Sequence, residues 1–374
     1  MAYYFANMEV QGQINLDSFQ PFRNLMDSSY TTYIRSSNPR SEGSLLCAHD
    51  DIQVQVMPDG WRFDSSNKNA PVTVTASKDY ARLEYFLPPC DDVEMQREKF
   101  ASLLRVAFEC RMAYHDTISL HASCFEINRQ AVAFSAPSGT GKSTRAATWV
   151  SGFGAIPISD DRPAIRLDGT KASACGVPWD GKGRVHRQVE VPLFAICEIR
   201  RSPFTRIRRL SKEQARQILM NQCFIPSWDH GATVAIMGIV SRLIDRTNIY
   251  RLFCGPDEDG AKSSRDILFH FDNKSDIKEA ASDMKIKSGF ILRNIVGEKI
   301  VMPVGENINK FEGALVLNEV SAFIWEKLQQ PIAREDLLDL ILAEYDVERD
   351  SASRDLDAFL KRLDDYQILE EEKK

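Results

Sequence analysis

Ala131-Val-Ala-Phe-Ser-Ala-Pro-Ser-Gly-Thr-Gly-Lys-Ser-Thr144 is the stretch that decides the fold. A short apolar strand, residues 131–135, enters a loop with two glycines, and a helix is expected to begin near Lys142. The glycines let backbone N–H groups turn inward, and the start of the helix adds partial positive charge, so the loop can hold phosphate oxygens. This order is that of a phosphate-binding loop (Walker A) and predicts a mixed α/β nucleotide-binding domain.

The residues of this loop have defined expected contacts. Lys142 would reach the β- and γ-phosphates of a nucleotide, and the Ser143 hydroxyl would bind Mg²⁺, so ATP and Mg²⁺ are the predicted cofactors. Ala136 replaces the first glycine of the usual pattern at the strand end, where the change is mild. A chance glycine-rich turn is the weaker alternative. The predicted nucleotide-binding residues are Ser138, Gly139, Thr140, Gly141, Lys142, Ser143 and Thr144.

Two adjacent carboxylates, Asp160 and Asp161, end the next apolar strand, residues 155–159. An acidic residue at a strand end beside a phosphate loop can bind Mg²⁺ directly or through water. With two of them, one can face the metal while the other accepts a proton from an attacking hydroxyl. The alternative is a polar strand end that leads into the turn at Pro163.

Two further features could serve the same site. His121 lies on a strand expected to pair with the phosphate-loop strand, where it could polarise a carboxylate or relay its proton. A lone histidine in an apolar strand is more often a satisfied core residue, so that interpretation stays open. In residues 177–187, glycines and cations alternate, which suits contact with phosphates or an acceptor chain and equally a solvated surface loop.

The composition is that of an ordinary folded protein. The chain has 374 residues, of which 43% are hydrophobic and 27% charged, which predicts two or three domains. A net charge of −6 argues against a nucleic-acid partner. No apolar run is long enough to span a bilayer, and the first residues lack a secretory pattern, so no membrane partner is expected. The eight cysteines are scattered without a C-x-x-C pair, which indicates neither zinc nor disulfides and predicts a cytoplasmic location.

The expected elements divide the chain. The ranges 3–10 and 118–127 are each expected to form one strand, and 93–114 an amphipathic helix. The predicted parts are a β-rich N-terminal part (1–92) and a catalytic core (118–254) within one ATP-binding domain (1–271), a polar linker (272–287), and a small C-terminal domain (288–374) with three strands and then three helices.

The core resembles the HPr kinase/phosphorylase family, in the order of His121, the loop 136–144 and the Asp160-Asp161 pair. The resemblance covers about residues 118–254 and implies transfer of the γ-phosphoryl group of ATP to a protein serine. It also implies catalytic roles for His121, Lys142, Asp160 and Asp161, with Asp160 as general base and Asp161 as a metal or orienting carboxylate beside Ser143. The order of the two aspartates stays open.

Two departures from that family indicate a divergent branch. Thr144 stands where the family has Glu, and Ala136 where it has Gly. These differences put a phosphocarrier substrate and the reverse, phosphorolytic reaction in doubt. The enzymes of that family are oligomers, which makes a homo-oligomer one expectation for this chain.

A second resemblance begins at Ala314-Leu-Val-Leu-Asn-Glu-Val-Ser-Ala-Phe-Ile-Trp-Glu-Lys-Leu328. A strand ending at Leu-Asn, with Asn318 as helix N-cap, is similar to PqqD-like modules, which are small α+β, winged-helix-like domains. Many of these recognise the leader of a ribosomally made precursor peptide, which adds as a strand to the sheet edge beside the last helix. A winged helix that contacts DNA or a second copy is the alternative, and the acidic balance disfavours DNA.

Together the resemblances imply a mixed α/β P-loop kinase domain of the HPr-kinase-like type, fused to a PqqD-like module. The expected function is Mg-ATP-dependent phosphorylation of a Ser or Thr hydroxyl in a ribosomally made peptide or small protein that the C-terminal module recruits. Two other functions stay open. One is a nucleotide-gated peptide chaperone or scaffold without phosphoryl transfer, and the other is a small-molecule kinase.

Overall fold

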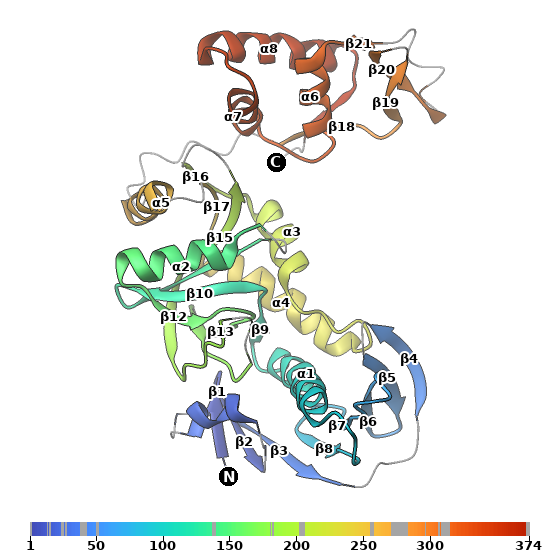
Figure 1. Cartoon of the computed structure of the whole chain (residues 1–374), viewed down its shortest axis with the longest axis vertical. Helices are drawn as coiled ribbons and strands as arrows, with labels where there is room; N and C mark the ends of the chain where they lie inside the picture. The colour runs from blue at the N-terminus through green and yellow to red at the C-terminus, as the bar shows by residue number, and fades with distance from the viewer. Residues whose placement is uncertain are drawn as a thin grey trace. The chain divides into compact units, whose positions relative to one another are not determined.

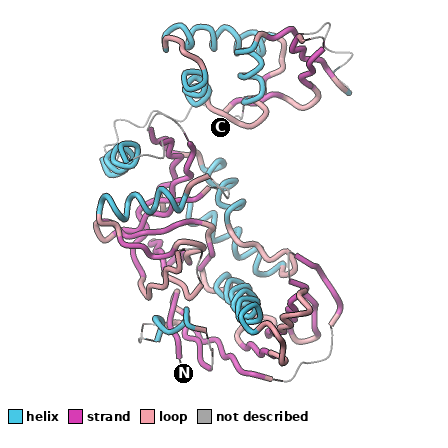
Figure 2. Tube along the Cα trace, viewed as in Figure 1, coloured by secondary structure: helices cyan, strands magenta, loops and turns pink. Residues whose placement is uncertain are grey.

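The described part of the chain contains both strands and helices (Figure 2). The structure is a computed structural model, and the statements below concern the residues that it describes. These are residues 2–12, 14, 16–23, 26, 28–37, 43–49, 52–136, 140–179, 181, 183–201, 206–254, 258–270, 283–295, 297–305, 307 and 315–371.

Contacts divide the chain into two compact units, each described here by itself. The first unit comprises Met1–Arg200, Ile207–Leu252 and Pro256–Arg265. The second comprises Arg201–Arg206, Phe253–Gly255 and Asp266–Lys374.

The first unit begins with an eight-stranded sheet, drawn in blue in Figure 1, in the order β1-β2-β3-β8-β7-β6-β5-β4. The pairs β2·β3 and β3·β8 are parallel and the other pairs are antiparallel. A 3-10 helix, η1 (Asp17–Arg23), follows β2. The strands are β1 (Ala2–Phe5), β2 (Met8–Gly12), β3 (Tyr30–Ser36), β4 (Ser44–His49), β5 (Ile52–Met57), β6 (Gly60–Ser65), β7 (Thr73–Ser77) and β8 (Arg82–Phe86).

The prediction of one strand over residues 3–10 is wrong. The chain reverses at Ala6 and Asn7, whose φ angles are 49° and 64°, and β1 then pairs with β2 as an antiparallel hairpin. Two successive left-handed residues are what a tight hairpin turn requires. Neither residue is a glycine, and the alternation of buried side chains continues on both sides, so the one local signal of the turn was Asn7, a residue type that tolerates the left-handed conformation.

Helix α1 (Val93–Ala113) confirms the helix predicted over residues 93–114, and it contacts both sheets of this unit. The Asp92 side chain accepts a hydrogen bond from the Met95 N–H at 2.9 Å, which caps the helix. The helix contacts β6 and β7 on one side and β9 and α4 on the other. Its apolar side chains, including Phe100 and Phe108, are buried in the core of the first sheet.

At the end of α1, the His115 ring stacks on the Tyr30 ring at 3.6 Å between centroids and 4° between planes. Burial, assisted by the nearby Arg111 charge, lowers the pKa of His115 from 6.5 to about 4. Below pH 6.5 the unfolded chain therefore binds a proton that the folded chain accepts only near pH 4.

We expect the free energy of unfolding to fall as the pH drops from 6.5 to 4, by on the order of 1–2 kcal/mol after solvent screening at this half-buried site. Urea unfolding at several pH values measures this fall. His115→Phe keeps the stacking and removes the titration, so its curve should be flatter than that of the wild type over the same interval. Parallel curves for the two proteins would contradict the assignment.

The second sheet of the first unit carries the phosphate loop. Its order is β12-β10-β11-β15-β14-β13-β9, with β17 pairing with β15 and β16 pairing with β17. β11 and β15 are parallel, whereas β10 pairs antiparallel with both β11 and β12. The strands are β9 (Thr117–Ser119), β10 (Ala122–Ile127), β11 (Gln130–Ser135), β12 (Ile156–Ser159), β13 (Ala164–Asp168), β14 (Lys171–Cys175), β15 (Glu190–Arg201), β16 (Arg206–Arg209) and β17 (Asn248–Cys254).

Helices cover both faces of this sheet. Successive residues of a strand point to opposite faces. Phe125 and Phe134 pack against Trp149 of α2, with ring centroids 5.1 and 5.2 Å from the indole, whereas Cys124 and Ala133 lie in the core that α3 and α4 share. The result is an α/β sandwich. Its helices are α2 (Lys142–Phe153), α3 (Lys212–Gln222) and α4 (His230–Arg246), and α5 (Glu258–His270) follows the last strand.

The prediction of one strand over residues 118–127 is also wrong. β9 pairs with β13 at one end of the sheet, whereas β10 pairs with β11 and β12. Between them, Leu120 forms an isolated bridge with Cys223, and the His121 N–H donates to the Gln222 carbonyl at 2.8 Å. This long-range contact moves the chain from one part of the sheet to another, and it places His121 at the break.

The second unit combines two short sheets with three helices. β18 pairs with β22, and the order of the other sheet is β19-β20-β21. The Asn318 side chain accepts a hydrogen bond from the Ser321 N–H at 2.8 Å, so the predicted N-cap is confirmed. The elements are β18 (Met284–Ile286), β19 (Phe290–Ile295), β20 (Glu298–Pro303), β21 (Leu315–Leu317), α6 (Glu319–Lys327), α7 (Arg334–Glu344), α8 (Arg349–Asp365) and β22 (Leu369–Glu371).

Strand β18 lies within the stretch expected to be a linker. Met284 and Ile286 are 9% and 7% exposed and belong to the core of the second unit, while Lys285 between them is half-buried. This period-two pattern is that of a strand with one buried face. Residues 272–282 of the expected linker lie outside the described residues.

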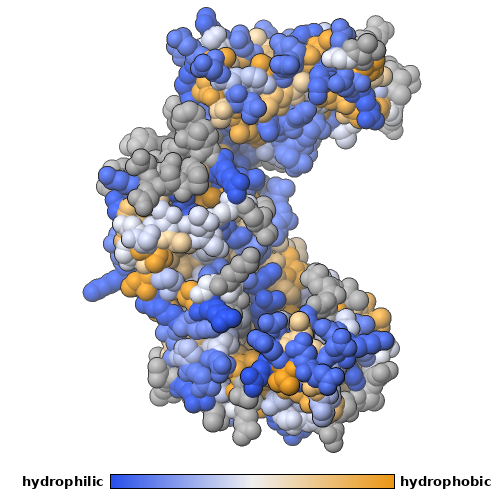
Figure 3. Space-filling model, in the orientation of Figure 1, coloured by the Kyte–Doolittle hydropathy of each residue, from blue (hydrophilic) through white to orange (hydrophobic). Residues whose placement is uncertain are grey.

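The surface is mostly hydrophilic on the face shown in Figure 3, where apolar residues form small groups. Among the described residues, no helix combines the length and the apolar character needed to cross a membrane.

Candidate functional site

The stretch predicted to be a phosphate loop lies between the end of β11 and the start of α2. Gly141 stands at the N-cap of α2 with φ 106°, and its carbonyl accepts the Arg145 N–H at 2.9 Å. A Cβ at Gly141 would meet nothing within 4 Å, so glycine is required by the backbone conformation rather than by space. The predicted residues Ser138 and Gly139 lie outside the described residues. Thr140 precedes Gly141, and Thr144 lies exposed in the first turn of the helix.

Lys142 is folded back into the loop. Its Nζ donates a hydrogen bond to the Ala136 carbonyl at 2.7 Å, and the residue is only 8% exposed. Burial lowers the pKa of Lys142, with the nearby Asp161 opposing this effect and Arg162 adding to it. An ammonium group has three N–H donors, so the group that holds the strand end can also donate to phosphate oxygens.

Ser143 connects the loop to the acidic strand end. Its Oγ lies 3.4 Å from the Ser123 Oγ on β10, and the Ser123 hydroxyl donates to the Asp160 carbonyl at 3.2 Å. Oxygen atoms of this kind, together with a carboxylate such as Asp161, are the ligands that Mg²⁺ prefers. No group of three or more His, Cys, Asp or Glu side chains suited to a metal occurs within the described part of the chain. Mg²⁺ bound to phosphates keeps several waters and needs few protein ligands, so the donors present fit this ion.

The two adjacent aspartates have different partners. The Asp161 Oδ1 lies 3.9 Å from the His121 Nε2, and the two side chains are 30% and 31% exposed. Burial lowers the pKa of His121, and the Lys142 charge adds to this effect, so the neutral ring is favoured. The Asp160 carboxylate instead accepts the backbone N–H groups of Gly181 at 3.0 Å and Gly183 at 2.5 Å. Asp161 therefore lies beside His121 and acts electrostatically on Lys142, while Asp160 faces the loop 177–187.

Three residues at this site, Arg162, Glu109 and Ser123, were not predicted from the sequence. Arg162 has φ 53°, its carbonyl accepts the Trp179 indole N–H at 3.0 Å, and its charge acts on both Lys142 and His121. Glu109 of α1 is 3% exposed and accepts the Ser119 hydroxyl at 2.6 Å. Burial raises the pKa of Glu109, which Arg105 and Arg162 oppose.

These three residues differ in whether the sequence marks them as functional. Arg162 directly follows the Asp-Asp pair and could have been included with it. Glu109 stands among the buried apolar residues of α1, and Ser123, the third missed residue, is an ordinary strand residue, so neither carries a sequence signal.

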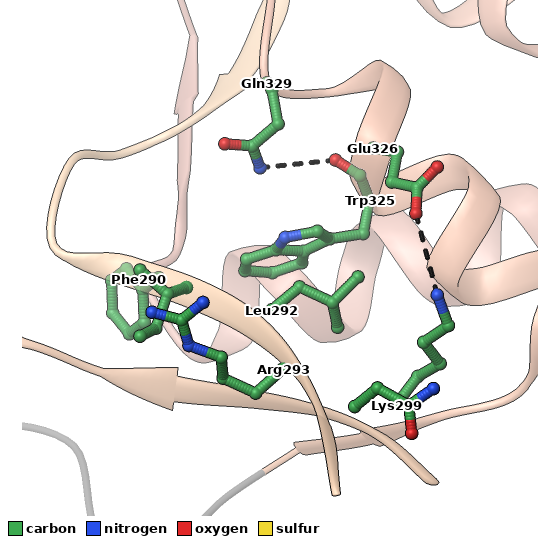
Figure 4. A pocket seen from close by; sticks show the side chains of 9 residues that line it. Phe290, Leu292, Arg293, Lys299, Trp325, Glu326 and Gln329 are labelled. Carbon is green, nitrogen blue, oxygen red and sulfur yellow. Dashed lines mark hydrogen bonds and ion pairs between the residues drawn. The ribbon is translucent and has the colours of Figure 1, made fainter. Parts of the chain in front are cut away.

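The second unit has a pocket of about 400 Å³ between β19 and α6 (Figure 4). Leu292 points toward the buried Trp325 ring, which gives the pocket an apolar floor. Lys299 Nζ lies 3.9 Å from Glu326 Oε1, and the Gln329 amide donates to the Trp325 carbonyl at 3.3 Å, so the rim is polar. The lining residues are Phe290, Ile291, Leu292, Arg293, Asn294, Lys299, Trp325, Glu326 and Gln329.

Within the described strands, β19 and β21 are the two edges of the three-stranded sheet. An edge strand presents unpaired N–H and C=O groups to which another strand can add. The predicted mode of peptide binding therefore has a structural basis at either edge.

Comparison with known families supports the interpretation of the C-terminal segment. Residues 298–369 match the family described as Coenzyme PQQ synthesis protein D (PqqD), so the PqqD resemblance predicted from the sequence is confirmed. A search of the curated proteins finds no match.

Two solved structures are similar to parts of the chain. One is TbiB1 in complex with the TbiA(beta) leader peptide, with 29% identity over 23% of this chain and 94% of that chain, at a TM-score of 0.20. The other is the Hpr(Ser) kinase/phosphatase from Coxiella burnetii, with 9% identity over 41% of this chain and 95% of that chain, at a TM-score of 0.24.

Proposed function

We propose that this chain is an ATP-dependent kinase, acting in the cytoplasm, that transfers the γ-phosphoryl group to a Ser or Thr hydroxyl of a ribosomally made peptide or small protein. The observation that carries the proposal is the meeting of Lys142, at the start of α2, with Asp161 and His121. A phosphate-binding loop beside a carboxylate is what phosphoryl transfer to a hydroxyl requires.

Each group has a part in this reaction. The N–H groups at the start of α2 and the Lys142 ammonium would hold and neutralise the phosphates. Mg²⁺ would be held by the Ser143 hydroxyl and, through water, by Asp161, and when bound it neutralises charge on the phosphates. A carboxylate of the aspartate pair takes the proton of the acceptor hydroxyl, and the neutral His121 orients it.

The second unit would recruit the acceptor. Its PqqD match, its open sheet edges and its pocket with an apolar floor and a polar rim suit an extended peptide that adds as a strand and places one apolar side chain in the pocket. A recruited acceptor has a raised effective concentration at the kinase site without any new contact there.

Mass spectrometry of a candidate precursor peptide, incubated with the full chain, ATP and Mg²⁺, tests the proposal. We expect the peptide to gain one phosphoryl group, and we expect no gain with Lys142→Ala. A protein that binds ATP and the peptide without any transfer would instead be a nucleotide-gated scaffold. ATP turnover driven by a metabolite and not by the peptide would indicate a small-molecule kinase.

Recruitment makes a separate prediction about the substrate. An acceptor peptide that lacks its recognition segment should show a KM raised by roughly 10²-fold, with kcat little changed, because only the local concentration is lost. Steady-state kinetics with the full and shortened peptides measures this. The recognition segment added as a separate peptide should inhibit the full acceptor and leave the shortened one unaffected. Equal KM values for the two acceptors would contradict recruitment by the second unit.

A further inference from the structure

The loop 177–187 is fastened to the acidic strand end by a clasp, defined here as the Asp160 carboxylate with the N–H groups of Gly181 and Gly183. Each carboxylate oxygen accepts one of these N–H groups, Oδ1 from Gly181 and Oδ2 from Gly183. Hydrogen bonds to a charged acceptor are stronger than neutral ones. The clasp therefore fixes the carboxylate and the loop against each other.

The glycines of the clasp are required for space. An added Cβ at Gly183 would lie 2.7 Å from the Asp160 Oδ2, and one at Gly181 would lie 3.1 Å from the same atom and 3.0 Å from the Asp161 Cβ. Neither glycine has a left-handed φ, so the backbone itself would accept another residue. A methyl group at Gly183 would thus displace the Asp160 carboxylate without straining the backbone conformation.

Both ends of this loop are anchored in the first unit. On one side Trp179 is 7% exposed, packs against Phe5 at 5.8 Å between ring centroids, and donates its indole N–H to the Arg162 carbonyl. On the other side the backbone of Arg187 lies against Gly176, where an added Cβ would be 1.7 Å from the Arg187 carbonyl oxygen. Between these anchors, the clasp holds Gly181 and Gly183 beside the aspartate pair.

Asp161 points elsewhere. Its carboxylate lies toward His121, and its charge acts on Lys142 at the start of α2. Asp161 is therefore the carboxylate beside His121, whereas Asp160 is engaged through both of its oxygens by the loop 177–187.

We propose that Asp160 is a positioning residue, which holds the loop 177–187 at the phosphate site so that the loop aligns the acceptor segment, and that Asp161 is the carboxylate at the reacting groups. This reverses the order of roles expected from the sequence. The inference rests on the proposed function, but the clasp itself can be measured without catalysis.

The first experiment follows kinetics. Asp160→Asn removes one acceptor oxygen, and Gly183→Ala displaces the carboxylate. We expect each to raise the acceptor KM about tenfold, with the KM for ATP unchanged, and we expect the double variant to be no worse than either single one, because both break the same clasp. Gly238→Ala, a glycine in α4 whose added Cβ would meet nothing within 4 Å, is the matched control and should behave as the wild type.

The opposite result is equally specific. If Asp160 were the proton acceptor, Asp160→Asn would lower kcat at least 10²-fold with an unchanged acceptor KM, and Gly183→Ala would not reproduce it. In that case the effects of the two substitutions would add in the double variant. Such a pattern overturns the positioning role.

The second experiment follows the loop in the full-length protein without any substrate. Hydrogen exchange of the peptide covering 181–187 should be about tenfold faster in Asp160→Asn and in Gly183→Ala than in the wild type and in Gly238→Ala. Unchanged exchange would disprove the clasp even if the protein is a kinase. Faster exchange in the two clasp variants, together with a wild type that phosphorylates no peptide, would keep the clasp and disprove the proposed function.

Discussion

Replacement of Lys142 by Met should lower kcat for phosphoryl transfer on the order of 10²–10³-fold. The substitution keeps the length of the side chain and removes the ammonium group, which is held at the loop by the Ala136 carbonyl and is 8% exposed. A preorganised cation that meets the charge of the transferring group in a water-poor site contributes this much to the rate. Burst and steady-state kinetics with the phosphopeptide as product measure the loss.

The control for this variant is Lys171→Met. Lys171 is an exposed lysine at the start of β14, in the same unit, and its removal changes the net charge by the same amount. Its kcat should match the wild type. A Lys142→Met protein with wild-type kcat and a normal KM for ATP would show that the loop does not hold the transferred phosphoryl group.

Trp149→Ala should lower the free energy of unfolding of the first unit by about 3–5 kcal/mol. Trp149 is fully buried and packs against three aromatic rings, of Phe125, Phe134 and Phe153, at 5.1, 5.2 and 6.1 Å between centroids. The indole fixes α2 on the sheet, so its loss leaves a cavity directly behind the phosphate loop. Urea unfolding followed by the far-ultraviolet signal measures the change.

Two further variants serve as controls for this prediction. Trp149→Phe keeps an aromatic ring in place and should recover a large part of the lost stability. Trp61→Ala removes an indole that is only half-buried and should cost less than Trp149→Ala. A loss below about 1 kcal/mol for Trp149→Ala would mean that the three aromatic rings close the cavity by repacking.

Local patterns predicted the elements around the phosphate loop closely. The strand predicted at 131–135 is β11 (Gln130–Ser135), and α2 begins at Lys142, because the loop pattern specifies its own backbone conformation. Asn318 was likewise recognised as an N-cap, since its side chain acts on the N–H of Ser321, three residues further on.

Features that depend on distant contacts were not predictable in the same way. The break at Leu120 and His121 depends on the bridge from Leu120 to Cys223. The apolar run 118–127 does not indicate which distant residue will pair with it. The difference in partners between Asp160 and Asp161 depends on where the fold places Gly181 and Gly183. The two adjacent aspartates have different hydrogen-bond partners because the loop 177–187 reaches only the Asp160 carboxylate.

The pairing of β18 with β22 joins the first and last strands of the second unit. Met284 stands opposite Glu371, and Ile286 opposite Leu369. The two ends of the segment 283–371 therefore lie side by side, as in modules that can be inserted into a surface loop of another protein with little disturbance. If the second unit binds the acceptor peptide as proposed, its binding should be transferable to another protein. Grafted as residues 283–371 onto an unrelated modifying enzyme, it should direct that enzyme to the same peptide.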